Sequence, residues 1–474
     1  MRKTRIICTI GPASSSQEVI MGLLKAGMDI ARINFSYGSR EDHERLISSI
    51  REASRKTGRP LALLQDLQGP KIRVGRLKKE SIYLREGASL TVTSRSIEGN
   101  ETAISVSYEY LSRDVKKGDR ILLDDGLIEL KVIGVTGEDV LAEVIDGGVL
   151  RAHQGVNLPG VCIKAPSLTE KDINDLKFGI AQQVDYVAVS FVRSSRDVLA
   201  AKEIIASTAE DIPVIAKLEK PEALKNLDSI LEVSDGVMVA RGDLGVEIPP
   251  QEVPILQKEI VEKANERKVP VIIATQMLQS MMEEMRPTRA EASDVANAVL
   301  DGADALMLSG ETAMGKYPVQ AVRMMDRIIR VAEKRGISGI RMPFSPGGGV
   351  SSFPDTISQA ATRAAEEVGA KAIVAFTQSG ATARLVAKQK PQVPIIAFTP
   401  ERRVSLRMCL YWGVIPRIMR PIENTDEMIM EVDRVLIKEK LAHAGDILVI
   451  VSGAPIFKKG TTNLMKLHRV SLQH

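Results

Sequence analysis

The stretch that decides the fold is residues 213–245, which reads PVIAKLEKPEALKNLDSILEVSDGVMVARGDLG. Two short apolar runs in it, residues 214–216 and 236–240, are typical of strands that are buried on both faces. The helical pattern between them, residues 221–233, makes the stretch a βαβ unit, and the strands of such a unit run parallel. The two strands therefore end at the same edge of one sheet.

Charged residues follow both apolar runs. Lys217 and Glu219 follow the first run, and Arg241 and Asp243 follow the second. Residues i and i+2 of a strand share a face, so Lys217 and Glu219 point toward the same place. Burying an unpaired charge costs several kcal/mol, so four charges at one sheet edge indicate a ligand. The alternative is an internal cluster of salt bridges at the strand ends.

Composition excludes several classes of protein. The chain has 474 residues, 44% of them hydrophobic, and a formal net charge of +4. This charge is too small to indicate a nucleic-acid-binding protein, and 3% aromatic residues leave little for base stacking. Three cysteines without CxxC spacing indicate neither a zinc site nor a disulfide framework. Since no run of about 18 apolar residues occurs, we expect a multi-domain cytoplasmic protein that binds no membrane.

Strand-like runs alternate with helix-like segments along most of the chain. The runs are residues 5–9, 30–33, 61–64, 186–189, 214–216, 236–240, 269–274 and 305–308. Eight such strands alternating with helices predict a (β/α)8 TIM barrel, an α/β fold, in residues 1–70 and 164–340. An open, doubly wound sheet is the alternative, but no GxGxxG motif follows the first strand.

The sequence loses its helical periodicity between the third and fourth barrel strands. Residues 71–163 contain alternating segments separated by Gly, Asp and Asn, which predict a small inserted all-β domain. The predicted strands are residues 89–93, 103–106, 120–123, 128–133 and 140–145. A linker rich in Gly and Pro follows the barrel at residues 338–352. The alternation then resumes and predicts a C-terminal α/β domain over residues 353–474.

Side chains at the carboxyl ends of barrel strands converge on one site. Polar residues follow nearly every predicted strand: Arg32, Asn34, Ser36, Asp66, Ser190, Lys217, Glu219, Arg241, Asp243, Thr275, Ser309 and Glu311. The carboxylates of Glu219 and Asp243, with no histidine or cysteine nearby, suit a hard cation such as Mg2+ or Mn2+. Arg32, Arg73 and Lys217 would balance anionic oxygens, which indicates phosphoryl transfer.

Residues 242–245, Gly-Asp-Leu-Gly, read as a turn whose backbone amides would hold a carboxylate. A metal-dependent aldolase or lyase on a barrel is the alternative to phosphoryl transfer, because such enzymes also place a Glu and Asp pair around Mg2+. A catalytically silent effector-binding protein is a further alternative.

A series of motifs, in order along the whole chain, resembles the pyruvate kinase family. They are TIGPAS (9–14), RINFS (32–36), GPKIR (69–73), GVNLPG (155–160), SFVR (190–193), AKLE (216–219), MVARGDLG (238–245), ATQML (274–278), RPTRAE (286–291) and LSGETA (308–313). The resemblance implies transfer of the phosphoryl group of phosphoenolpyruvate to ADP, giving pyruvate and ATP, in glycolysis. It also implies a homotetramer.

The resemblance assigns roles to individual residues. Lys217 would stabilise the phosphoryl group during transfer, and Glu219 with Asp243 would hold the divalent metal. The amides of Gly242 and Asp243, together with Thr275, would bind the substrate carboxylate.

Further roles concern the phosphates, the proton and the nucleotide. Arg32 and Arg73 would face the phosphates, and a relay from Thr275 through Ser309 and Glu311 would protonate the enolate. The residues implied at the nucleotide are Asn34, Ser36, Arg73 and Tyr37. The contact of Tyr37 stays open, because the family usually has His at this position. We expect His43 to be a surface residue of a helix. The inserted domain would close over the nucleotide as a lid.

Two positions depart from the pattern of family members that need a monovalent cation. Those members generally have Glu after Gly-Pro and Thr after the Asp of strand three, whereas this chain has Lys71 and Leu67. The residues implied at that cation site are Asn34, Ser36, Asp66 and Leu67. We predict that the Lys71 ammonium replaces K+, so that activity does not require K+.

The C-terminal domain contains residues 377–382, TQSGAT, between a predicted strand and a predicted helix. Hydroxyls and amides at a helix N-terminus form a phosphate cradle. The resemblance implies that Thr377, Ser379, Gly380 and Thr382 bind a phosphorylated effector, a sugar phosphate or AMP, with help from residues 452–463. A capped turn without a ligand is the alternative.

Overall fold

A computed structural model describes residues 1–161, 163, 166–336, 352–421, 424–453 and 462–471. Among these residues, eight parallel strands close into a barrel in the order β1-β17-β16-β15-β14-β13-β3-β2. They are β1 (Arg5–Thr9), β2 (Ile30–Asn34), β3 (Ala62–Asp66), β13 (Tyr186–Val189), β14 (Val214–Leu218), β15 (Gly236–Ala240), β16 (Val271–Ala274) and β17 (Ala305–Leu308). Every residue of these strands except Asn34 is buried, which explains their continuous apolar sequences. The predicted (β/α)8 barrel is confirmed.

Helical segments alternate with these strands. They are α1 (Gln17–Ala26), α2 (Arg40–Thr57), α4 (Glu170–Ala181), α5 (Ser195–Ala206), α6 (Pro221–Lys225), α7 (Leu227–Val233), α8 (Arg241–Glu247), α9 (Val253–Glu266), η1 (Gln279–Met282), α10 (Arg289–Leu300), α11 (Gly310–Ala313) and α12 (Pro318–Gly336). The single helix expected over residues 221–233 is wrong, because Asn226 (φ −105, ψ 15) separates α6 from α7.

By compactness the chain divides into two units. One contains Met1–Gln65, Gly179–Val187 and Val261–His474, and the other contains Asp66–Phe178 and Ala188–Ile260. The side-chain contacts reported below lie within one unit or the other.

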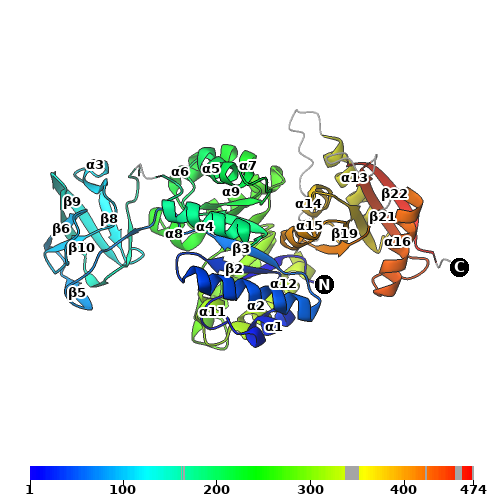
Figure 1. The fold of residues 1–474 in the computed structure, drawn as a ribbon, viewed down its shortest axis with the longest axis horizontal. Coiled ribbons are helices and arrows are strands. Elements are labelled where there is room, and N and C mark those ends of the chain that lie inside the picture. Colours follow the sequence, from blue (N-terminus) through cyan, green and yellow to red (C-terminus); the bar gives the residue numbers. More distant parts are fainter. Residues whose placement is uncertain (162, 164–165, 337–351, 422–423, 454–461, 472–474) are drawn as a thin grey trace. The chain divides into compact units, whose positions relative to one another are not determined.

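The segment from residue 72 to residue 157, here called the β module, lies in the second unit. Its described strands form a seven-stranded sheet, β4-β12-β8-β9-β10-β6-β7, and a two-stranded sheet, β11-β5 (Figure 1). The elements are β4 (Ile72–Arg73), β5 (Ser81–Leu84), β6 (Ser89–Thr93), β7 (Ala103–Ser105), α3 (Leu111–Asp114), β8 (Arg120–Leu123), β9 (Ile128–Thr136), β10 (Asp139–Asp146), β11 (Gly148–Arg151) and β12 (Gly155–Asn157). The sequence did not predict β4, β5, β11 and β12, which have two to four residues each.

Alternate residues of the β module build one hydrophobic core. Leu90 and Val92 of β6 pack with Val140, Ala142 and Val144 of β10, while the residues between them face outward. This pattern of period two is the feature that made the segment readable as β structure.

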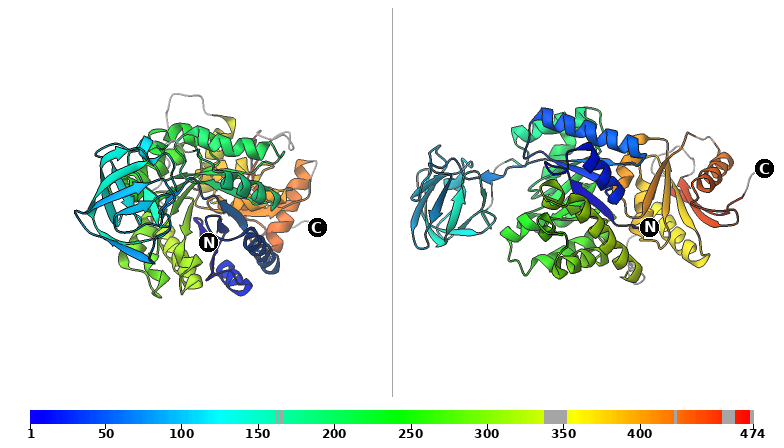
Figure 2. Two further views of the ribbon diagram at one scale, coloured as in Figure 1. Left: turned by 60° about the vertical axis from the view of Figure 1, so that its left-hand side comes forward. Right: turned by 90° about the horizontal axis from the view of Figure 1, so that it is seen from below.

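A five-stranded sheet of order β20-β19-β18-β21-β22 lies in the first unit. Its elements are α13 (Phe353–Glu367), β18 (Ala372–Phe376), α14 (Ala381–Lys388), β19 (Ile395–Thr399), α15 (Arg402–Arg407), η3 (Met408–Leu410), β20 (Val414–Ile418), α16 (Thr425–Lys438), β21 (Ile447–Gly453) and β22 (Thr462–Arg469). Ile373 and Ala375 pack with α13 and α14, whereas Ala372 and Val374 pack with α16. Helices therefore cover both faces of the sheet, as Figure 2 also shows. The predicted linker at residues 338–352 lies outside the described residues, except for Ser352.

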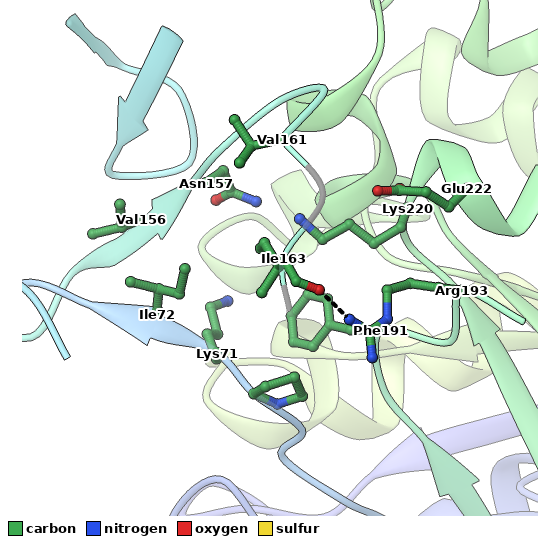
Figure 3. Close-up of a pocket in the computed structure, with 11 residues that line it drawn as sticks. Lys71, Ile72, Val156, Asn157, Val161, Ile163, Phe191, Arg193, Lys220 and Glu222 are labelled. Atoms are coloured by element: carbon green, nitrogen blue, oxygen red, sulfur yellow. Dashed lines mark hydrogen bonds between the residues drawn. The ribbon is translucent and has the colours of Figure 1, made fainter. Parts of the chain in front are cut away.

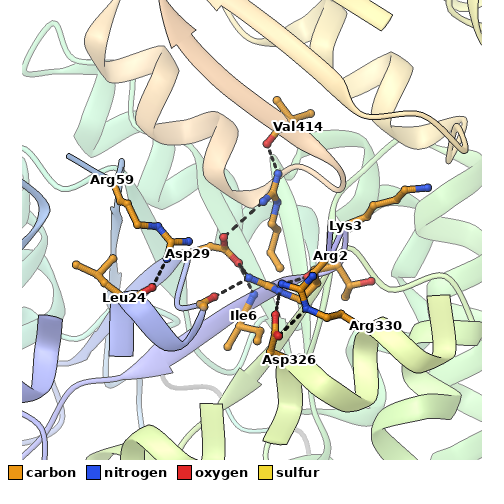
Figure 4. Close-up of polar contacts among 12 residues, drawn as sticks. Arg2, Lys3, Ile6, Leu24, Asp29, Arg59, Asp326, Arg330 and Val414 are labelled. Atoms are coloured by element: carbon orange, nitrogen blue, oxygen red, sulfur yellow. Dashed lines mark hydrogen bonds and ion pairs between the residues drawn. The ribbon is translucent and has the colours of Figure 1, made fainter. Parts of the chain in front are cut away.

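Arginines near the N-terminus join segments that are distant in sequence. Arg2 pairs with Asp29 at 2.8 Å and with Asp326 of α12 at 2.9 Å (Figure 4). Arg5, the first residue of β1, donates to the backbone carbonyl of Val414 in β20. These buried contacts tie the start of the barrel to the five-stranded sheet within the first unit.

Two further observations concern the cysteines and the length of the helices. In the described part of the chain, Cys8 and Cys409 are buried free thiols, and burial raises the pKa of Cys409 to about 12. None of the described helices has the length and apolar character needed to cross a membrane.

Candidate active site

Lys217 is the centre of a buried polar group. The predicted strand stops at Ala216, but β14 continues to Leu218, so this lysine lies within the strand. Its Nζ atom lies 2.9 Å from Glu219 Oε1 and 3.2 Å from Asp66 Oδ1. It also donates to Ser190 Oγ at 2.8 Å. An ammonium has three donors, and these three acceptors can satisfy all of them.

Glu219 lies directly after β14 and is 1% exposed. One oxygen accepts from Lys217, and the other accepts from the backbone N–H of Phe191 at 2.7 Å. Phe191 has φ 53, which turns its amide toward the carboxylate at the cost of backbone strain. Burial raises the pKa of the Glu219 carboxyl; the Lys217 ammonium opposes this rise, and the negative charge of Asp243 adds to it.

Asp243 lies in the first turn of α8. The turn expected over residues 242–245 is wrong, because these residues are helical. The Asp243 Oδ1 atom lies 3.5 Å from the Nζ of Lys71, and both side chains are partly exposed, at 28% and 27%. Lys71 and Asp243, far apart in sequence, therefore form an ion pair beside the buried group.

The donor set of these residues fits a divalent metal. Asp66, Glu219 and Lys217 carry two negative charges and one positive charge in a buried place. Buried charge that is not balanced is costly, and hard cations prefer carboxylate oxygens. Among the described residues no three His, Cys, Asp or Glu side chains cluster as a ready metal cage. In proteins, Mg2+ is usually bound by one or two carboxylates and takes its other ligands from substrate and water.

Three other predicted residues of this unit make local hydrogen bonds. The backbone carbonyl of buried Leu67 accepts from Ser190 Oγ at 2.7 Å. Arg73, in β4, donates from Nη1 to the carbonyl of His153 at 3.0 Å, which lies in the same β module. Arg241 donates a long hydrogen bond, of 3.4 Å, from Nη1 to Gln257.

The first unit contains the predicted residues that follow β2. Arg32 is buried and donates from Nη1 to Thr9 Oγ1 at 2.9 Å. Asn34 Oδ1 accepts from the N–H of Ser36 at 3.1 Å, and the side chain of Tyr37 is 67% exposed.

The expectation that His43 lies on the surface is wrong. Its ring is buried and stacks on Phe35, with centroids 4.0 Å apart. The helix turns His43 inward onto the loop that follows β2, and a pattern of apolar residues alone does not reveal this.

Thr275 follows β16 in the same unit and has φ 67. A β-branched residue in this region is strained, and such strain concentrates at functional sites. Its Oγ1 donates to the carbonyl of Ala274 at 2.6 Å.

Glu311 and Ser309 follow β17. Glu311 is fully buried and accepts from the N–H groups of Leu278 at 2.9 Å and Ser309 at 2.8 Å. The Ser309 hydroxyl is one of the few buried polar side-chain atoms that have no hydrogen-bond partner within the described part of the chain. Since buried polar groups are normally paired, this hydroxyl is suited to a water or a substrate atom.

The TQSGAT loop joins β18 to α14. Gly380 has φ 86 and donates its N–H to Thr377 Oγ1 at 2.8 Å. A side chain at this position would meet the ring of Tyr411. Thr382 shares a 2.7 Å hydrogen bond with Thr462 of β22, and Ser379 is exposed. Most of the helper segment, residues 454–461, lies outside the described residues.

Sequence reasoning missed several polar partners of this region. Asp172 accepts from the N–H of Gly69 at 3.0 Å, and Phe191 binds Glu219 through its backbone. Lys220 and Asn157 both contact Glu247. Among the partners that were missed, Phe191 and Asn157 lie in the family motifs. The contact of Phe191 is made by its backbone, so the type of its side chain gives no sign of it.

Comparison with known proteins matches both parts of the chain. Residues 1–322 match a family described as "Pyruvate kinase, barrel domain", and residues 355–468 match "Pyruvate kinase, alpha/beta domain". A pyruvate kinase of Corynebacterium glutamicum is 47% identical over 471 residues, covering 98% of this chain and 97% of the relative. One from Geobacillus stearothermophilus is also 47% identical, covering 99% of this chain and 81% of the relative. A crystal structure of a Cryptosporidium parvum pyruvate kinase has a TM-score of 0.94 at 37% identity, covering 99% of this chain and 96% of that one.

The barrel and these matches together define the class of the protein, which is a phosphotransferase. The family transfers the phosphoryl group of phosphoenolpyruvate to ADP in glycolysis, and it generally needs a divalent metal. The chain belongs to the pyruvate kinase family. This assignment decides against the aldolase or lyase alternative.

Proposed function

We propose that Lys217 stabilises the phosphoryl group while it passes from phosphoenolpyruvate to ADP. The observation that carries this proposal is the buried group around Nζ, where Asp66, Glu219 and Ser190 hold the ammonium in one position. A fixed positive charge in a place shielded from water stabilises developing negative charge without further reorganisation. Lys217 is thus suited to the charge that develops on the transferring oxygens.

Glu219 and Asp243 are the proposed ligands of the divalent metal, Mg2+ or Mn2+. When bound, the metal supplies positive charge to phosphoryl oxygens. Both residues offer carboxylate oxygens, and the negative charge of Asp243 acts on Glu219 strongly enough to raise its pKa further. Two nearby carboxylates are more stable with a cation beside them.

Further proposed roles concern the substrate carboxylate and the proton. We assign the Gly242 and Asp243 amides and Thr275 to the carboxylate, and Arg32 to the phosphate. The strained backbone of Thr275 supports its assignment. Ser309 and Glu311 form the proposed relay to the enolate, because the Ser309 hydroxyl is buried and its backbone is held by Glu311.

The nucleotide is assigned to Asn34, Ser36 and Tyr37 and to Arg73 of the inserted domain, and this domain, residues 71–163, is the proposed lid. Closure of such a lid would exclude the water that competes for the phosphoryl group. The other proposed domain limits are residues 1–70 and 164–340 for the barrel and 353–474 for the C-terminal domain.

Lys71 takes the electrostatic place of a monovalent cation in this proposal. That site would otherwise include Asn34, Ser36, Asp66 and Leu67. The support is the position of the Lys71 ammonium, 3.5 Å from Asp243. A covalently attached positive charge at this distance makes K+ unnecessary.

A phosphorylated metabolite, a sugar phosphate or AMP, would regulate the enzyme at the TQSGAT loop. Thr377, Ser379, Gly380 and Thr382 lie in the loop before helix α14 and in its first turn, where amides and hydroxyls favour phosphate. A screen of phosphorylated metabolites against the phosphoenolpyruvate saturation curve tests this part. A curve that none of them shifts would reject it.

We further propose that the protein acts in the cytoplasm and assembles as a homotetramer. An apolar groove between α10 and α12 supports a contact between copies of the chain, since it includes Ala296, Leu300 and Val331, the last 57% exposed. Light scattering measures the assembly, and Val331→Glu should yield a smaller species.

The proposed reaction is tested with purified protein, phosphoenolpyruvate, ADP and Mg2+. Pyruvate is followed through lactate dehydrogenase, and ATP is measured separately. We expect equal amounts of both products. Pyruvate formed without ATP would reject phosphoryl transfer to ADP.

A further inference from the structure

Two carboxylates of helix α8 contact the two chain segments that lead into and out of the β module. Asp243 and Glu247 are four residues apart, a spacing that places them on the same side of a helix. Asp243 pairs with Lys71, which precedes β4. Glu247 accepts a hydrogen bond from Asn157 Nδ2 at 2.9 Å, at the end of β12. Since β4 and β12 pair with each other, α8 contacts both connections at one place.

The contact at Glu247 is buried. The side chain is 2% exposed, and its Oε1 also lies 2.5 Å from the Nζ of Lys220, which is 10% exposed. The Lys220 ammonium lies 5.9 Å from the centre of the Phe191 ring. Figure 3 shows Lys220 and Asn157 lining one cavity together with Phe191. A hydrogen bond to an ionised carboxylate in such a place is stronger than one at the surface.

A turn of the β module lies next to the same helix. A Cβ atom built on Gly126 would lie 3.7 Å from Val246 Cγ1, so a side chain at this turn would be in van der Waals contact with the residue before Glu247. The module therefore contacts α8 at Glu247 and approaches it at Val246, while Lys71, just before the module, pairs with Asp243.

The two carboxylates differ in how firmly they hold the module. The pair of Asp243 with Lys71 is 3.5 Å long and partly exposed, and Asp243 is the proposed metal ligand. The bond of Glu247 to Asn157 is shorter and buried, and Lys220 balances its charge. Glu247 is therefore able to keep its contact while Asp243 serves the reaction.

We propose that Glu247 is a positioning residue for the nucleotide step. Through Asn157 it anchors the returning strand of the β module to the helix that carries Asp243, and it thereby sets the affinity for ADP. Lys220 pairs with the Glu247 carboxylate and helps to hold it in position against Asn157. This inference rests on the proposed role of residues 71–163 as a lid over the nucleotide.

The test uses the full-length protein with the substitution Asn157→Asp. This change keeps the shape of the side chain but sets a second carboxylate against Glu247, so the contact becomes repulsive. We expect the KM for ADP to rise about tenfold, the effect of ~1.4 kcal/mol. The KM for phosphoenolpyruvate and kcat should stay within about twofold, which a general loss of folded enzyme would not produce.

A double variant and a measurement without catalysis sharpen this test. N157D/E247Q exchanges donor and acceptor and leaves one carboxylate within reach of Lys220, so it should restore most of the ADP affinity. Amide hydrogen exchange of β4 and β12 should be faster in N157D than in the natural protein, without any substrate present. The matched control is Asn226→Asp, because Asn226 donates a bond of the same length, 2.9 Å, to Arg193 but lies outside the β module.

Two results would overturn the inference. If N157D leaves both hydrogen exchange and the KM for ADP unchanged, Glu247 does not anchor the module. If exchange becomes faster while the KM for ADP stays the same, the anchor exists but does not set ADP affinity. In either case the proposed roles of Lys217 and of the metal ligands are tested separately, by substitutions of those residues.

Discussion

The Nζ atom of Lys217 lies 2.9 Å from Oε1 of Glu219, two residues further along the chain at the end of one barrel strand. Side chains two residues apart on a strand share a face, so the strand itself brings this pair together. The barrel then buries it and adds Asp66, whose carboxylate lies 3.2 Å from the same ammonium. The protein thus keeps a positive charge in a fixed place, next to carboxylates able to bind a metal.

Replacement of Lys217 by Met should lower turnover by about two to three orders of magnitude or more, the usual effect of removing one strong transition-state donor. The coupled lactate dehydrogenase assay measures it. Because the change leaves Asp66 and Glu219 without their ammonium, thermal unfolding should be followed on the same sample. Lys202→Met is the control, since Lys202 pairs with Asp235 at a partly exposed site. Near-normal turnover of the folded variant would remove Lys217 from its assigned role.

The affinity of the site for the divalent metal should fall as the pH decreases. This fall should begin at a higher pH than the titration of an exposed glutamate would give. Burial raises the pKa of Glu219 from its ordinary value of 4.5. In the folded protein, the Glu219 carboxylate therefore binds a proton at a higher pH than an exposed glutamate does. A protonated carboxyl is a poor metal ligand. In the absence of metal, the same shift makes the contribution of Glu219 to the free energy of unfolding increase as pH falls through its folded pKa.

Titration of Mn2+ binding by electron paramagnetic resonance, over a series of pH values, measures this dependence. Glu219→Gln should bind the metal weakly and lose the part of the pH dependence that belongs to Glu219. An acidic limb that is identical in the variant and the natural protein would contradict the assignment.

Activity should not depend on K+. In a buffer whose only monovalent cation is tetramethylammonium, addition of KCl should change kcat by less than about twofold, because the Lys71 ammonium near Asp243 already supplies the charge. Lys71→Met should lose activity, and K+ should restore part of it. Lys79→Met is the matched control, since Lys79 pairs with Glu101 at an exposed site. Strong stimulation of the natural protein by K+ would show that Lys71 does not replace the cation.

Asp304→Asn should destabilise the protein strongly. The Asp304 carboxylate lies 2.5 Å from Lys388 and 2.7 Å from Lys390, and all three side chains are buried. Removal of one partner of a buried ion pair costs about 3–5 kcal/mol, because the remaining charge has no counter-ion. Chemical denaturation measures the loss. Glu439→Gln, which breaks the more exposed pair with Arg417, should cost less than about 1 kcal/mol. Equal losses in the two variants would refute this ranking.

The sequence by itself determined the barrel and the identity of its main polar residues. Strands buried on both faces are mostly apolar, so runs such as residues 236–240 are recognisable one at a time. Charged residues that follow such a run are costly to bury unless they bind a ligand. This argument identified Lys217, Glu219 and Asp243 as candidate site residues. The four unpredicted strands of the β module pair as β4 with β12 and β5 with β11, segments far apart in sequence, so no local pattern marks these pairs.

Only the tertiary structure decided which groups pair with these charges. Two of the partners of Lys217 come from β3 and from the residue after β13, and one partner of Glu247 comes from β12, so no local pattern contains them. The tertiary fold also made residues 242–245 helical, turned His43 inward and gave Thr275 a positive φ. The physical reason is the range of the forces. Burial along a strand can be predicted from neighbouring residues in the sequence. Ion pairs, backbone strain and shared hydrogen bonds depend on where distant segments of the chain meet.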